Sequence, residues 1–133
     1  MAAVWIDANV VLRFISGDPP DMAARALELM KRAESGEVEL RLSHLVLAEI
    51  VWVLASYYNY PKMKIADVLI SFITADGILA EEGEILITAL NNMANKNVDF
   101  VDAYLAARAF EKGEAVCSFD RDFKKLDVAW VVP

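Results

Sequence analysis

The chain has 133 residues, of which 57% are hydrophobic and 25% charged, and its net charge is −7. This composition indicates one globular domain over residues 1–133 and excludes a disordered or low-complexity protein. The acidic balance argues against tight, non-specific binding of nucleic acid, because phosphates favour a basic surface. A single cysteine and a single histidine exclude a disulfide framework and a zinc site made from several such ligands.

The predicted elements alternate between strand and helix along the chain. In order, the pattern predicts a strand at residues 4–7, helices at 8–16 and 22–35, a strand at 38–42, helices at 44–58, 61–75, 81–96 and 98–112, a strand at 115–119, a short charged helical turn and a strand at 128–132. This alternation predicts an α/β fold. We expect a three-layer α/β/α sandwich with a mainly parallel central sheet of four to five strands.

No segment is long enough to span a membrane. The longest apolar stretch, residues 45–55, is interrupted by Glu49, whereas a bilayer needs about 20 residues. The first residues lack the basic start of a secretory signal, so we expect a cytoplasmic protein without a membrane partner. The high apolar content also predicts a surface that contacts a partner or a second copy of the chain.

Acidic residues follow two of the predicted strands. Asp7 closes the first strand, and Asp120 and Asp122 follow the strand at residues 115–119. Ligands of open α/β sheets bind at the carboxyl ends of strands. Helix capping explains the same residues in purely structural terms, and both interpretations stay open.

Glu49 is the strongest single anomaly, because its helical neighbours are apolar on every side. The pattern predicts a buried carboxylate, which must meet a cation, a metal or a shared proton. The structural alternative is a buried salt bridge to Arg13 or Arg108.

Asp99 and Asp102 lie three residues apart and therefore on one helical face. Either Asn97 or Asp99 can cap this helix, whereas apolar residues surround Asp102. Because all these acids belong to one geometric class, we expect them to share a cavity.

Carboxylates that share a cavity repel one another unless a cation intervenes. Oxygen ligands without histidine or cysteine suit Mg²⁺ or Mn²⁺. Such ions can activate water and stabilise a leaving oxygen, so the predicted reaction is metal-dependent phosphoester hydrolysis. We interpret His44 as a structural residue and Cys117 as part of a buried strand.

At this point the sequence resembles the PIN domain family, and more narrowly the VapC-type toxin ribonucleases of toxin–antitoxin pairs. The resemblance rests on four segments in order: VWIDANVVLRF, LVLAEIVWVL, VDFVDAYLAARA and VCSFDRDF. It implies that Asp7, Glu49, Asp102 and Asp120 form the catalytic metal site. Asp99 and Asp122 would lie nearby, and Asn9 and Ser118 would support the site.

The same resemblance implies a cofactor and partners. Similar proteins cleave RNA with Mg²⁺ or Mn²⁺, often at tRNA or rRNA loops, and they form homodimers inhibited by a small antitoxin. If the acids share one pocket, four of the seven excess negative charges belong to a metal site, and bound ions reverse the local sign. We therefore expect RNA binding to be weak without metal.

Two other functions remain open at this level. The first is a non-catalytic α/β binding module, in which Tyr57, Tyr58 and Tyr60 contribute a contact surface. The second is a haloacid-dehalogenase-type phosphatase with Asp7 as nucleophile. In that mechanism a second aspartate should stand two residues later, where this chain has Asn9. Mn²⁺ binding that Glu49→Gln abolishes would argue against the first, and a phospho-aspartate at Asp7 would support the second.

Overall fold

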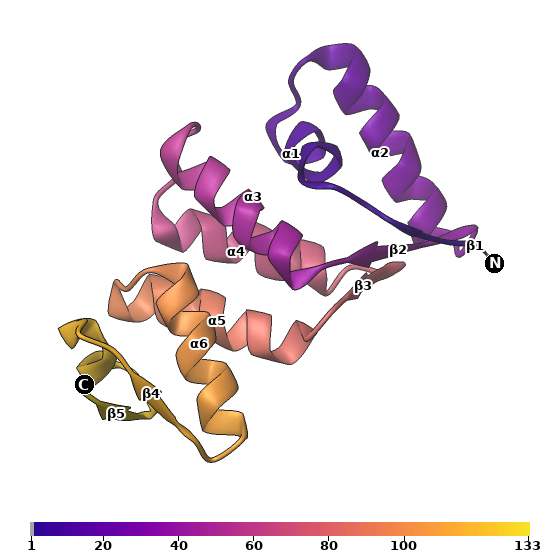
Figure 1. Cartoon of the computed structure of the whole chain (residues 1–133). Helices are drawn as coiled ribbons and strands as arrows, with labels where there is room; N and C mark the ends of the chain where they lie inside the picture. The colour runs from indigo at the N-terminus through magenta and orange to yellow at the C-terminus, as the bar shows by residue number, and fades with distance from the viewer. Residues whose placement is uncertain (1) are drawn as a thin grey trace.

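The computed structural model describes residues 2–133, in which strands and helices alternate (Figure 1). In chain order the elements are β1 (Ala2–Trp5), α1 (Ala8–Ser16), α2 (Pro20–Glu34), β2 (Val38–Leu42), α3 (His44–Ser56), α4 (Lys62–Ile73), β3 (Ile78–Ala80), α5 (Gly83–Lys96), α6 (Phe100–Glu111), β4 (Ala115–Cys117), the 3₁₀ helix η1 (Arg121–Lys125) and β5 (Ala129–Val131). Across these residues no helix combines the length and apolar character that a membrane crossing requires.

The predicted elements are present, with small shifts at their ends. Helix α2 begins at Pro20 rather than at residue 22, because a proline in the first helical turn loses no hydrogen bond. The first strand ends at Trp5, and Asp7 instead forms the N-cap of α1. The sequence pattern thus defines these elements better than it defines their boundaries.

Strand β3 is the element that the sequence pattern does not reveal. Its apolar run covers only residues 78–80, whereas the predicted strands that contain β4 and β5 extend over residues 115–119 and 128–132. The chain enters it through Gly77, whose φ of +84° favours glycine. A Cβ at Gly77 would also collide with the backbone of Ala33 near the end of α2. This close approach fixes where β3 joins the sheet.

The five strands form two sheets, and every pair of neighbours is parallel. One sheet has the order β1-β2-β3, and the other contains β4 and β5. In the first sheet Val4 lies opposite Leu40, and Leu40 lies opposite Ile78. The predicted α/β class with parallel strands is confirmed, whereas the expected single sheet is divided into two.

Helix α3 supplies much of the hydrophobic core. Leu47, Ile50 and Leu54 are fully buried on one side of this helix. They belong to one cluster of buried residues that extends from Ile6 to Leu126. The two sheets are therefore connected through helices rather than through strand pairing.

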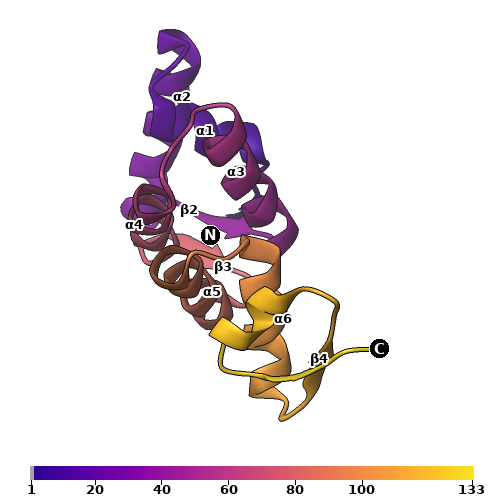
Figure 2. The same cartoon turned by 90° about the vertical axis from the view of Figure 1, so that its left-hand side faces the viewer.

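The molecule is elongated (Figures 1 and 2), and its two sheets lie on opposite sides in the view of Figure 1. Helix α2 packs on β2 and α4 packs on β3, whereas α6 contacts β4 and α5. The carboxyl end of β1 is consequently remote from the carboxyl end of β4. This separation determines which of the predicted site residues meet.

Candidate active site

Asp102 and Asp120 lie together near the carboxyl end of β4. Asp102 stands in the first turn of α6, which packs on β4, and Asp120 precedes η1. Partial burial raises the pKa of Asp102, and the negative charges of Asp99, Asp120 and Asp122 raise it further. A side-chain hydrogen bond between Asp102 and Asp120 contributes to the same shift. The structure therefore brings these four acids into one cluster, which we call the β4 acid cluster.

The backbone around Asp120 is held by several hydrogen bonds. The Ser118 hydroxyl oxygen accepts a bond from the Asp120 N–H at 2.9 Å, and Oδ1 of Asp120 accepts one from the Asp122 N–H at 2.9 Å. The Trp130 indole N–H donates to the Ser118 carbonyl oxygen at 2.9 Å. Ser118 thus contacts Asp120 directly.

Asp99 and Asp122 have different local surroundings within the cluster. Asp99 occupies the N-cap position of α6, but its side chain makes no capping hydrogen bond. The capping explanation for Asp99 is therefore wrong at the level of the side chain. Asp122 forms an ion pair with Lys125 at 3.3 Å, which offsets part of its negative charge.

Asp7 lies outside the β4 acid cluster. It is exposed at the carboxyl end of β1, and its Oδ1 accepts a hydrogen bond from the Val10 N–H at 3.1 Å. Together with Asn9, Arg13 and Arg25 it lines a pocket of about 420 Å³ between α1 and α2. The helix-capping interpretation of Asp7 thus describes its local structure.

The prediction that Glu49 is a buried carboxylate is wrong. Glu49 is exposed and makes no ion pair within residues 2–133. It lies on a solvent-facing stripe of α3 with Leu45 and Trp52, which are 71% and 69% exposed. The apolar neighbours of Glu49 form an exposed surface rather than core. Sequence periodicity cannot distinguish a fully buried helix from a helix with an exposed apolar face.

Neither arginine proposed as a partner of Glu49 pairs with it. Arg108 binds Glu82 at 2.6 Å. The Nε atom of Arg13 is buried and has no hydrogen-bond partner in the described part of the chain. Cys117, expected in a buried strand, is also exposed, because the outer edge and faces of β4 are not fully covered.

A cluster that the sequence did not reveal surrounds Glu82, at the corner between β3 and α5. Glu82 accepts a hydrogen bond from the Tyr104 hydroxyl at 2.6 Å and forms the ion pair with Arg108. His44 Nδ1 lies 3.3 Å from Glu82, and its ring stacks on Tyr104 with centroids 5.7 Å apart. We call Glu82, His44, Tyr104 and Arg108 the Glu82 clamp, because together they fasten α6 to the end of the first sheet.

The pKa values at the clamp follow from these contacts. Burial, followed by the hydrogen bond to Glu82, raises the pKa of Tyr104 to about 12. The neighbouring Glu81 accepts hydrogen bonds from the backbone N–H and then the ring of His44, which lowers its pKa. His44 is a structural residue in this arrangement, as the sequence predicted.

The acidic residues fit a hard divalent cation in the type of their donor atoms. They do not complete a site, because no three side chains of His, Cys, Asp or Glu within residues 2–133 are arranged to hold an ion. Asp102 and Asp120 lie together, but Asp7 and Glu49 are not among the groups that perturb Asp102. Two of the predicted ligands thus meet, and the full metal site stays a prediction.

The chain alternates strands and helices, its paired strands are parallel, and acids follow two of these strands. The PIN domain family matches residues 4–129, and the chain therefore belongs to this family. PIN domains are generally metal-dependent nucleases, which hydrolyse phosphodiester bonds of nucleic acids. No curated protein matches the chain.

Proposed function

We propose that the chain is a metal-dependent RNA endonuclease and the toxin of a VapC-type toxin–antitoxin pair, with residues 1–133 forming one catalytic domain. Membership of the PIN family is the observation that carries this proposal. The β4 acid cluster supplies the matching chemistry. The family finding favours a nuclease over the phosphatase and over the non-catalytic binding module.

In this proposal Asp102 and Asp120 bind Mg²⁺ or Mn²⁺. Asp7 and Glu49, which lie outside the β4 acid cluster in this conformation, complete the ligand set. Partial burial and the neighbouring negative charges oppose the ionisation of Asp102 and raise its pKa. A cation bound at the cluster would offset this repulsion. A bound divalent ion supplies an activated water and neutralises developing charge on the phosphate. Asp99 and Asp122 add negative charge nearby. Ser118 positions Asp120, whose N–H it binds, and Asn9 supports Asp7, with which it lines the pocket between α1 and α2.

The surface beside the acid cluster suits single-stranded RNA. Arg121, Lys124 and Lys125 are exposed on η1, directly after Asp120. Phe119 is 78% exposed and stands between Ser118 and Asp120. Basic groups bind the backbone and an exposed aromatic ring stacks on a base, which is the usual combination for unpaired nucleic acid. Loops of tRNA or rRNA are the substrate class that we propose.

Purified protein tests the enzymatic part of the proposal. We expect cleavage of structured RNA with Mg²⁺ or Mn²⁺, loss of cleavage in EDTA and loss in Asp102→Asn. The matched control is Asp67→Asn, which alters an exposed aspartate on α4. Cleavage that survives both EDTA and Asp102→Asn would contradict the proposal. A preference for DNA of the same sequence would contradict the RNA assignment alone.

Expression in cells tests the toxin part. We expect the chain to arrest growth, Asp102→Asn to be harmless, and a small antitoxin encoded beside the gene to restore growth. Sequencing of RNA ends after induction would identify the target. Normal growth despite active enzyme would separate the toxin role from the nuclease activity.

A further inference from the structure

Strand β1 has an unpaired edge with an apolar surface. It pairs only with β2 among residues 2–133, so its other edge is free. All four of its residues, Ala2–Trp5, are exposed, with Val4 at 41% and Trp5 at 61%. Parallel strands are normally covered on both faces, and exposed edges usually carry charges that block pairing. This strand lacks both protections, so its free edge is available for pairing with another strand.

Strand β4 also has an unpaired edge. It pairs only with β5 in the described chain, and a two-stranded sheet is marginal alone. Cys117 on β4 and the following Phe119 are exposed. The other edge of β4 is therefore also available for pairing.

Joining these two edges would also join the acids. Asp7 comes two residues after the end of β1, and Asp120 comes three residues after the end of β4. Neighbouring parallel strands end at the same edge of a sheet, where ligands bind. A parallel β1–β4 pair would place Asp7 beside Asp120 and would unite both sheets.

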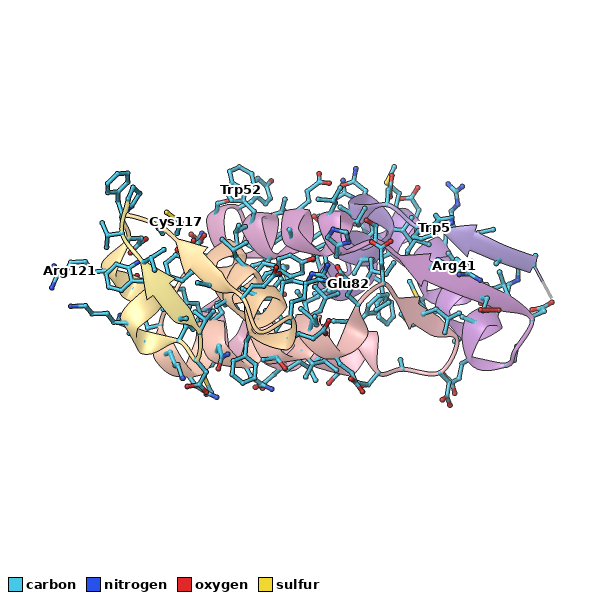
Figure 3. The ribbon with its side chains drawn as sticks, turned by 60° about the horizontal axis from the view of Figure 1, so that its bottom comes forward. Trp5, Arg41, Trp52, Glu82, Cys117 and Arg121 are labelled. Carbon is cyan, nitrogen blue, oxygen red and sulfur yellow. The ribbon has the colours of Figure 1, made fainter. Side chains whose placement is uncertain are left out.

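The chain cannot make this pair with itself in the observed conformation. Figure 3 shows Trp5 on β1 and Cys117 on β4 toward opposite ends of the molecule, with Glu82 between them. The Glu82 clamp fastens α6, on which β4 packs, through the Arg108 and Tyr104 contacts at 2.6 Å. With these contacts in place, β4 lies at the opposite end of the molecule from its own β1.

We propose that β1 of one copy pairs with β4 of a second copy, and that the reciprocal pair forms in the same two-fold dimer. Each active site is then shared: Asp7 comes from one copy, and Asp102 and Asp120 come from the other. The identity of this site as a nuclease centre rests on the function proposed above. The dimer itself rests only on the free strand edges and the clamp.

Complementation between two inactive variants tests the shared site. Asp7→Asn and Asp120→Asn are co-expressed with different tags and purified through both tags. In the mixed dimer one site carries both changes and the other carries neither, so we expect about half of the wild-type activity. A site built within one copy would leave each centre with one defect, and an inactive mixed dimer would overturn the proposal.

The matched control pairs two variants from the same half of the site. Asp102→Asn with Asp120→Asn puts one defect in each shared site, so this mixed dimer stays inactive. Activity in this control would also contradict the shared arrangement, as would failure to recover any mixed dimer.

Cross-linking tests the dimer without any activity measurement. The double variant Ala3→Cys, Cys117→Ser is co-expressed with the wild-type chain and treated with a short bis-maleimide. We expect a covalent dimer joining the new thiol on β1 to Cys117 of the other chain, and none when that chain is Cys117→Ser. In Ala3→Cys alone, a cross-linked species of monomer mass would overturn the proposal.

The two tests separate the two claims. A cross-linked dimer without RNA cleavage by the wild-type chain would reject the proposed function and retain the dimer. RNA cleavage by a chain that sediments as a monomer and gives no dimer cross-link would reject the dimer and retain the function.

Discussion

The carboxyl ends of β1 and β4 share the same local structure but have different tertiary surroundings. At each end an aspartate follows a parallel strand and caps the next helix: Asp7 binds the Val10 N–H, and Asp120 binds the Asp122 N–H. Asp120 meets Asp102 because α6 packs on β4, whereas Asp7 meets no second carboxylate of the β4 acid cluster. Local sequence thus determines the cap, and tertiary packing determines whether the cap becomes part of a site.

The largest effect that bears on this comparison concerns activity. Asp120→Asn keeps a capping oxygen, so the stability of the fold should be unchanged. RNA cleavage should fall by at least about 100-fold, because loss of a residue that merely supports a metal ligand already costs up to about that much. Asp7→Asn, measured beside it, sharpens the comparison. An equal fall would place both ends in one working centre, and full activity in Asp7→Asn would confine the chemistry to β4.

The next effect concerns the clamp that separates the two ends. Glu82→Ala removes the acceptor of the Tyr104 hydrogen bond and the ion-pair partner of Arg108. We expect a loss of about 2 kcal/mol in the free energy of unfolding, measured by urea denaturation. Glu84→Ala is the control, since Glu84 is exposed in the first turn of the same helix. Equal losses in both variants would show that the clamp does not hold α6.

A smaller effect distinguishes the structural role of Asp7 from its proposed chemical role. Asp7→Ala removes the cap of α1 and should destabilise the protein by about 1 kcal/mol, whereas Asp7→Asn retains the cap and should not. Thermal unfolding of the two variants provides the measurement. If both lose the same stability, the carboxylate charge rather than the hydrogen bond to Val10 stabilises this end.

The smallest expected effect is a gain, rather than a loss, in the free energy of unfolding. Because the pKa of Asp102 is raised in the folded chain, its ionisation opposes folding, so stability is lost as the pH rises through that pKa. Asp102→Asn should therefore be more stable than the wild type at neutral pH, by less than about 1 kcal/mol after solvent screening. The gain should disappear as the pH falls toward 3.8. A gain that is constant with pH would refute electrostatic strain at β4.

The sequence predicts elements well here because their signals are local. Glycine and proline stops, helical spacing and strand alternation identify all helices and four of the strands. Strand β3 is missed because its apolar run ends after residue 80, whereas those at β4 and β5 are longer in sequence than the strands themselves. The division into two sheets could not be foreseen, because strand pairing depends on contacts between distant segments. Four acids were expected to share one cavity, but only Asp102 and Asp120 of these four lie together in the structure. The prediction that Glu49 is buried was wrong, because apolar neighbours in sequence do not distinguish a core helix from one with an exposed apolar surface.

The free edges of β1 and β4 also make each copy bifunctional in the sense of polymer chemistry. A molecule whose two free edges pair with each other can form either a closed dimer or an open chain of copies. The same β1–β4 contact occurs in both assemblies. Dilution favours the closed pair, because its second contact forms within a single assembly. A lysine placed in β1, such as Ala3→Lys, would block pairing at this edge and so prevent both the closed dimer and the open chain.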